Sequence, residues 1–126
     1  MKAPKPSVKN ENARSIGEQV IGPGLREVSA RHPSVGEVGG LGVFWALELV
    51  RSRETREPLV PYNAGGAAAQ PMVEFASAMR GRGAWPFVHF NRTHFVPPCT
   101  VNADEVDEGI AALDVALETT DRYYAE

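Results

Sequence analysis

The sequence predicts an α+β domain, a small sandwich in which helices cover a largely antiparallel sheet. Hydrophobic periodicity places the elements in the order helix, strand, helix, strand, strand, helix. Only the first of the strand-to-strand links carries a helix, which disfavours a doubly wound parallel fold. The chain has 126 residues, 43% of them hydrophobic and 23% charged, as expected for one globular domain.

The N-terminal part begins without an apolar pattern. Residues 1–9, MKAPKPSVK, contain two prolines, so we expect a flexible lead-in there and the folded domain over residues 10–126. From residue 10 to Pro33, apolar residues recur at helical spacing, but Gly22-Pro23-Gly24 interrupts them. Because Pro23 lacks an amide proton and clashes with the preceding turn, the pattern predicts two short helices with a break between them.

A glycine-rich segment and an apolar run follow. Residues 34–42 hold four glycines, which we interpret as tight turns. They precede a strand rather than a helix, so no helix N-terminus follows to bind a phosphate, and no cofactor-binding residue is expected. The near-continuous apolarity of residues 43–50 favours a strand that is buried on both faces or crosses the centre of a sheet. Residues 51–66 predict a long surface loop, either functional or lying against another domain.

The C-terminal half predicts a helix, a hairpin and a longer helix. Pro71 suits a first helical turn, and apolar positions at helical spacing extend this helix to Gly81. Two β-prone runs, 84–90 and 93–96, flank Asn91-Arg92 in the pattern of a tight hairpin. Asn102 is a good N-cap for a last helix that reaches about Tyr124. The predicted core face of that helix is Val106, Ile110, Leu113 and Leu117.

Charge and composition exclude several classes of protein. All three lysines lie in residues 1–9, so the net charge of −3 divides into +3 there and −6 in the rest, where ten arginines oppose sixteen carboxylates. An acidic body without a basic stripe disfavours nucleic acid as a partner. The longest apolar run, residues 41–50, is too short to span a membrane, and no apolar stretch of a secretory signal follows the start. With one cysteine, Cys99, and so no internal disulfide, the chain is predicted to be cytoplasmic.

Metal-ligand and nucleophile candidates have simpler structural interpretations. His89, His94 and Cys99 recur every five residues, whereas zinc sites prefer closer pairs, and we expect the two histidines to face different ways, so no metal site is predicted. Cys99 lacks an evident base, and we expect a small buried thiol beside Pro98. The carboxylates after Asn102 are expected to stabilise a helix N-terminus rather than to bind a cation. They are Asp104, Glu105, Asp107 and Glu108.

Arg92 is the candidate ligand-binding residue, and no catalytic residue is predicted. It lies at the tip or shoulder of the predicted hairpin, among Phe90, Thr93 and Phe95. A guanidinium in this position can hold a carboxylate through two hydrogen bonds. An exposed arginine is also common in hairpins, so the residues alone leave both interpretations open.

Three stretches of the chain share the order and spacing of a known family. They are RHPSVGEVGGLGVFWALELV over residues 31–50, TREP over 55–58 and NRTHFVPP over 91–98, which leads into the final helix. Together they resemble the C-terminal small domain of class III pyridoxal-phosphate-dependent aminotransferases, close to the omega-amino acid:pyruvate and taurine:pyruvate type. The resemblance extends from about Asn10 to Leu117 and implies a sheet of three or four strands covered by helices.

The resemblance also implies a partner domain and a cofactor. In such enzymes a large domain supplies the lysine that forms the Schiff base with pyridoxal phosphate. Here the only lysines lie in residues 1–9, so we expect no cofactor bound to this chain alone and no activity from it in isolation. The implied enzyme is a homodimer that transfers an amino group from an amine or omega-amino acid to a keto acid such as pyruvate.

Two positions depart from the family pattern. Gly39 stands where the family often has arginine, and counting back from Pro97 places the family's substrate-carboxylate arginine nearer Phe87 than Arg92. Arg92 therefore takes that role only if the hairpin of this chain is shorter than the hairpin of the family pattern. A free-standing, non-catalytic binding or scaffold module of the same fold is the alternative hypothesis.

Overall fold

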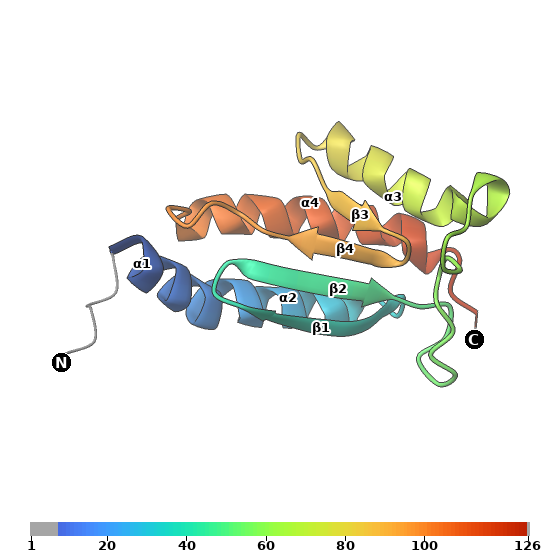
Figure 1. Cartoon of the computed structure of the whole chain (residues 1–126), viewed down its shortest axis with the longest axis horizontal. Coiled ribbons are helices and arrows are strands. Elements are labelled where there is room, and N and C mark those ends of the chain that lie inside the picture. The colour runs from blue at the N-terminus through green and yellow to red at the C-terminus, as the bar shows by residue number, and fades with distance from the viewer. Residues whose placement is uncertain (1–7, 126) are drawn as a thin grey trace.

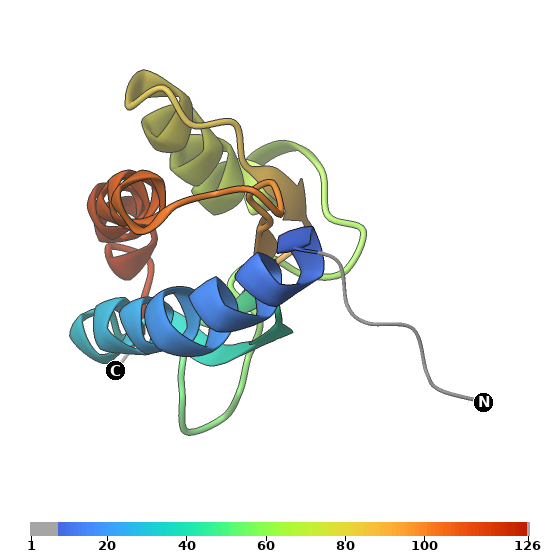
Figure 2. The ribbon, with the colours of Figure 1, turned by 90° about the vertical axis from the view of Figure 1, so that its left-hand side faces the viewer.

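A four-stranded antiparallel sheet forms one layer of the domain, and helices packed on one of its faces form the other (Figure 1, Figure 2). The computed structural model describes residues 8–125. The strands lie in the order β1-β2-β4-β3, with β1 spanning Val35–Leu41, β2 Phe44–Leu49, β3 Phe87–His89 and β4 Arg92–Phe95. The helices are α1 (Val8–Ile16), α2 (Gly22–Arg31), α3 (Gln70–Gly81) and α4 (Ala103–Asp121). The predicted α+β sandwich with an antiparallel sheet is confirmed.

The helical trace at the start of the domain continues through the predicted break. A π-helical turn, Gly17–Ile21, joins α1 directly to α2, and the Gly22 N–H donates to the Gly17 carbonyl five residues earlier. Pro23 therefore lies in the first turn of α2, where its missing N–H is not needed. The predicted lead-in lies outside the described residues as far as residue 7, whereas residues 8 and 9 already belong to α1.

The segment interpreted as turns is a strand. β1 pairs with β2 from Val35 to Leu41, and its inward positions include Gly36 and Gly40. A Cβ atom on Gly40 would lie 2.3 Å from Cδ2 of Trp45, and one on Gly36 would lie 2.7 Å from Cγ1 of Val50. Side chains of β2 and of the residue after it thus occupy the space inside β1, so Gly36 and Gly40 reflect close packing rather than turns. The turn prediction is confirmed for Gly42, which lies between β1 and β2 with φ of 59°.

β2 lies between β1 and β4, as predicted for a central strand, but the described residues cover only one of its faces. Trp45, Leu47 and Leu49 are buried against the helices, whereas Phe44 on the opposite face remains 60% exposed. The Trp45 indole N–H donates to the Gly42 carbonyl at 2.7 Å, so the buried ring has no unpaired donor. The prediction of burial on both faces is wrong for the part of the chain that the structure describes.

The long loop after β2 enters the core instead of remaining on the surface. Leu59 and Val60 are buried, and the Leu59 N–H donates to the Leu49 carbonyl at 3.0 Å. Earlier in the loop, the Arg53 guanidinium donates to three backbone carbonyls at or beyond the end of α2: those of Ser29, His32 and Val35, at 2.8, 2.8 and 3.1 Å. These bonds hold the loop against the end of α2 and the start of β1, where the Ser29 and His32 carbonyls also accept backbone N–H groups.

The predicted hairpin is confirmed, but its turn lies one residue earlier. β3 and β4 are joined by Phe90 and Asn91, so Arg92 is the first residue of β4 and not part of the turn. Phe90 adopts a left-handed conformation, with φ of 55°. Asn91 holds the turn against β2, because its side chain donates to the Leu49 carbonyl at 3.0 Å and its carbonyl accepts from the Leu49 N–H at 2.8 Å.

The last helix forms as predicted. The Asn102 side chain accepts from the Glu105 N–H at 2.9 Å, and the Glu105 carboxylate accepts from the Asn102 N–H at 3.1 Å, which completes a capping box. Three residues of the predicted core face, Val106, Leu113 and Leu117, are buried, and the fourth is partly buried. The helix ends at Asp121 rather than near residue 124. Within the described residues, no helix is both long and apolar enough to cross a membrane.

Candidate functional site

Arg92 lies on the face of the sheet opposite the helices. We name this surface the open face, because no helix in the described range covers it (Figure 2). Cross-strand pairing places Arg92 beside Glu48 on one side and His89 on the other. Strand alternation then defines the full set of outward residues. They are Glu37, Gly39 and Leu41 of β1, Phe44, Ala46 and Glu48 of β2, Phe87 and His89 of β3, and Arg92 and His94 of β4.

A hollow of ≈ 350 Å³ on the open face is bordered by Arg92. Its guanidinium makes no hydrogen bond or ion pair with another residue of the described range, so its donors are available to a ligand carboxylate. The carboxylates of Glu37 and Glu48 border the same hollow. Glu37 is already paired with Arg56 at 3.4 Å, so the hollow presents the unpaired Arg92 guanidinium beside the carboxylate of Glu48. Phe87, the position nearer the family's arginine, lies on the same face.

The three metal-ligand candidates do not come together. His94 packs edge-on against Phe44 and Phe87, at ring-centroid distances of 5.6 and 5.1 Å, and His89 packs on Phe90. The two histidines share the open face, so the expectation that they face different ways is wrong. Among residues 8–125, no group of three or more His, Cys, Asp or Glu side chains is arranged to hold a metal ion.

Cys99 is exposed, so the expectation of a buried thiol is also wrong. It follows the Pro97-Pro98 pair, where the chain turns away from β4 toward α4. Its carbonyl, rather than its sulfur, is used in the fold, since it accepts a hydrogen bond from the Asn12 side chain at 2.7 Å. This bond from a side chain to the backbone holds the turn against α1.

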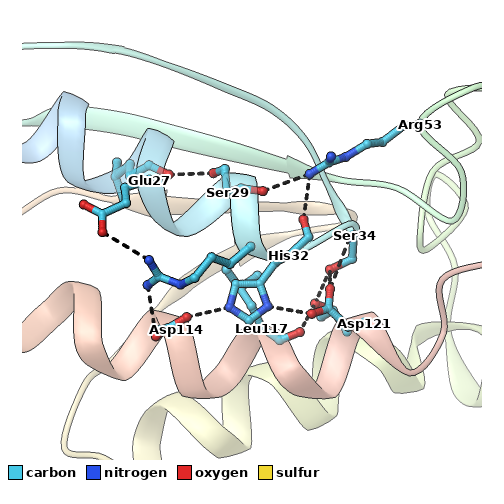
Figure 3. A network of polar contacts seen from close by, with 11 residues as sticks. Glu27, Ser29, His32, Ser34, Arg53, Asp114, Leu117 and Asp121 are labelled. Carbon is cyan, nitrogen blue, oxygen red and sulfur yellow. Dashed lines mark hydrogen bonds and ion pairs between the residues drawn. The ribbon is translucent and has the colours of Figure 1, made fainter.

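A buried polar network that the sequence did not predict joins the end of α2 to α4 (Figure 3). His32 is only 6% exposed, and its Nδ1 and Nε2 lie 2.5 Å from Asp121 and 2.6 Å from Asp114. Because each ring nitrogen faces a carboxylate oxygen, the arrangement favours the imidazolium form of His32, in which both nitrogens donate. The Ser34 N–H and hydroxyl donate to the other oxygen of Asp121, at 3.2 and 2.6 Å.

This network is structural rather than catalytic. The Ser34 side chain is fully buried and already donates to Asp121, so its oxygen cannot reach a substrate. The partners are 82 and 89 residues apart in the chain, and only the fold brings them together. One sequence signal was available. Asp114 and Asp121 are seven residues apart and so lie on one side of the helix, next to its apolar face.

The network shifts two pKa values in opposite directions. Burial alone would lower the pKa of His32, but the hydrogen bonds and negative charges of Asp114 and Asp121 outweigh burial and raise it above its usual 6.5. The pKa of Asp114 falls below its usual 3.8, chiefly because it accepts a hydrogen bond from His32 and also because Arg31 contacts it at 3.2 Å. Both shifts favour the ion pair over the neutral form of either partner.

We expect the free energy of unfolding to have a maximum in mildly acidic solution. A raised His32 pKa contributes stability that is fully present below about pH 6.5 and is lost as pH rises through the folded-state pKa. A lowered Asp114 pKa contributes stability that is present above about pH 3.8 and is lost as pH falls through the folded-state value. Urea unfolding between pH 3 and pH 9 measures this, with His32→Gln as the control. A His32→Gln profile that keeps the fall above neutral pH would contradict the assignment.

The sequence and the fold both have known relatives. No family model matches the chain. It is 31% identical over 118 residues to the taurine–pyruvate aminotransferase of Bilophila wadsworthia, an alignment that covers 90% of this chain and 25% of that protein. Its fold superposes on the taurine:2-oxoglutarate aminotransferase of Bifidobacterium kashiwanohense, in complex with PLP and glutamate, with a TM-score of 0.80 at 25% identity, over 89% of this chain and 24% of that one. In sequence and in fold, the chain is similar to the C-terminal part of class III aminotransferases.

Within this family the chain corresponds to the C-terminal small domain. It also matches an amine transaminase from an uncultivated Pseudomonas species, with a TM-score of 0.73 and 34% identity over 85% of this chain but only 22% of that enzyme. The chain spans about a quarter of the length of the curated relatives it matches.

The residues of this aminotransferase domain do not fit pyridoxal phosphate by themselves. Residues 10–126 contain no lysine, so the domain offers no amine for a Schiff base with the cofactor. The hollow beside Arg92 is bordered by Glu37 and Glu48, which would repel a phosphate group.

Proposed function

We propose that the chain acts as the small domain of a pyridoxal-phosphate-dependent aminotransferase. The enzyme would move an amino group from an amine or omega-amino acid to a keto acid such as pyruvate. The observation that supports this is the alignment of 90% of the chain with a taurine–pyruvate aminotransferase, of which it spans only a quarter. In this proposal residues 10–126 form the small domain, a large domain supplies the Schiff-base lysine, and the chain alone is inactive.

The complete enzyme is proposed to be a cytoplasmic homodimer. The single cysteine, which is exposed, is consistent with a reducing compartment. An exposed thiol on a secreted protein would be open to oxidation or to intermolecular pairing.

The deciding experiment is the intact mass of the native polypeptide that carries the tryptic peptide HPSVGEVGGLGVFWALELVR. We expect a mass several times the 13.6 kDa of this chain, and a lysine that borohydride reduction labels with the pyridoxyl group. The purified polypeptide should transfer an amino group from taurine or omega-amino acids to pyruvate. A native mass near 13.6 kDa, without a separate lysine-bearing partner, would instead support a free-standing, non-catalytic module.

We further propose that Arg92 holds the carboxylate of the keto acid or of the amino acid product. Its exposed guanidinium, without a partner among the described residues, supports this role. In the complete enzyme, Arg92→Ala is expected to raise KM for pyruvate about tenfold with little change in kcat, since one charge-assisted pair is worth about 1.5 kcal/mol. Steady-state kinetics measure both constants. Arg14→Ala, which removes an exposed arginine of α1, is the control, and equal KM values for the two variants would rule out the role.

A further inference from the structure

We propose that the groove between α3 and the β3–β4 hairpin binds a small amphipathic carboxylate, a molecule with an apolar body and one carboxyl group. The groove contains a hollow of ≈ 320 Å³. It lies on the helical side of the sheet, because Val88, which lines it from β3, alternates with Phe87 and His89 of the open face. The inference goes beyond the proposed function and does not depend on it.

One side of α3 forms an apolar wall of the groove. Met72 and Ala76 line it one helical turn apart, with Val73 beside them. Val73 is 52% exposed, whereas Phe75, on the side of α3 that faces the core, is fully buried. The helix therefore has a second apolar side, which borders open space instead of the core.

The charged residue of the groove is Arg80, one turn after Ala76 on the same side of α3. Its guanidinium lies over the ring of Trp85, 5.9 Å from the ring centroid, and forms no ion pair within residues 8–125. Stacking on a ring leaves the N–H groups at the edge of the guanidinium free to donate. The described residues that line the groove include no carboxylate. An apolar wall with one cation complements a ligand that has an apolar body and one carboxylate.

A strained residue forms another wall of the groove. Phe90 lines it from the turn between β3 and β4, and its φ of 55° is a left-handed conformation that is unfavourable for a residue with a Cβ atom. The surrounding rings hold it there, since its centroid lies 4.5 Å from that of Tyr62 and 4.4 Å from that of His89. Such strain is concentrated at ligand-binding sites. A glycine would adopt this turn without strain but would leave the groove without this wall.

The sheet edge beside the groove favours a small molecule over a peptide. β3 is an edge strand of three residues, Phe87–His89. Its two end residues pair with β4 on either side of Val88, next to a two-residue turn, so only Val88 directs its N–H and carbonyl to the free edge. An added peptide strand would gain hydrogen bonds from that one residue. The volume of the hollow is at the lower end of the range for small-molecule sites.

Thiol labelling of the native polypeptide tests the location of the site. Val73→Cys places a thiol in the groove, and the exposed Cys99 is the internal reference. Alkylation by iodoacetamide is followed by peptide mass spectrometry, with phenylbutyrate as the amphipathic probe. At about ten times its Kd the probe leaves about one site in eleven free, so alkylation of the introduced thiol should slow about tenfold while that of Cys99 does not change. Equal rates with and without the probe would overturn the proposal. An introduced thiol that is protected without any probe would also overturn it, because a protein segment would then cover the groove.

Two further variants test how the two parts of the probe are recognised. In the Val73→Cys background, Kd is the probe concentration that halves the alkylation rate. Arg80→Ala should raise Kd for phenylbutyrate about tenfold, the effect of one charge-assisted pair, and leave Kd for the uncharged phenylbutanol unchanged. Arg82→Ala, which removes an exposed arginine outside the groove, is the matched control.

Phe90→Gly suits the left-handed turn but removes one wall of the groove, so it should weaken the binding of both probes. Equal Kd values for the Arg80 and Arg82 variants would contradict the assignment of Arg80 to the carboxylate. A Phe90→Gly variant that binds both probes as tightly as the parent protein would contradict the assignment of the apolar part.

Discussion

Replacing Asp121 with alanine is expected to lower the free energy of unfolding by about 2–3 kcal/mol, because the change takes one of two carboxylate partners from the buried His32. The variant leaves two donors without an acceptor, His32 Nδ1–H and the Ser34 N–H, whereas the Ser34 hydroxyl keeps the Thr120 hydroxyl as a partner at 2.7 Å. Ser34 is fully buried and His32 nearly so, and a buried donor that loses its acceptor destabilises the fold.

Thermal and urea unfolding measure the effect, and a fall in Tm on the order of 10 °C is expected. Glu118→Ala removes an exposed carboxylate from the same helix and is expected to change stability by less than about 0.5 kcal/mol. Asp121→Asn keeps an acceptor for Ser34 but loses the charge opposite His32. Its stability should therefore lie between those of Asp121→Ala and Glu118→Ala. If Asp121→Ala and Glu118→Ala unfold at the same temperature and urea concentration, the network does not stabilise the contact between α2 and α4.

Replacing Gly40 with alanine is also expected to have a large effect: it should lower the free energy of unfolding by about 2–3 kcal/mol. The new Cβ would lie 2.3 Å from Cδ2 of Trp45 and 2.5 Å from the Phe44 carbonyl oxygen, so β1 must move away from β2 or the indole must leave its site. Moving the indole also breaks its hydrogen bond to the Gly42 carbonyl.

Gly39→Ala is the matched control for this substitution. Gly39 is the preceding residue of β1, it points to the open face, and a Cβ there meets nothing within 4 Å. Where the new Cβ meets no other atom, replacing a glycine with alanine reduces the conformational entropy of the unfolded chain. The Gly39→Ala variant should therefore be as stable as the parent protein or slightly more stable. Urea midpoints of the two variants measure the difference. Equal midpoints would mean that β1 does not have the register that places Gly40 inward.

Local patterns predicted much of the fold. α3 and α4 carry clear helical periodicity, and Asn102 with Glu105 has the spacing of a capping box, so these elements follow from short-range chemistry. β1 was missed because two of its inward positions, Gly36 and Gly40, are glycines, and the space beside them is filled by Trp45 of β2 and by Val50. The hairpin turn was misplaced because Phe90 takes a left-handed conformation that the sequence rules assign to glycine or asparagine.

The candidate site was predicted less completely than the fold. Arg92 was identified by residue type, but its place on the open face depends on the sheet register, which pairs it with Glu48. Glu37 joins the same hollow from a segment that was interpreted as turns. The His32 network depends on contacts across more than eighty residues, and no local pattern contains that information.

The π-helical turn between α1 and α2 has a consequence for how this domain compares with its relatives. A turn closed by a five-residue hydrogen bond contains one residue more than an α-helical turn of the same rise. That surplus residue takes up no extra length along the axis, so both helical ends keep their positions. A relative with a regular helix here should therefore align with a single-residue gap between Gly17 and Ile21, while Leu25 and the rest of α2 keep their places in the core.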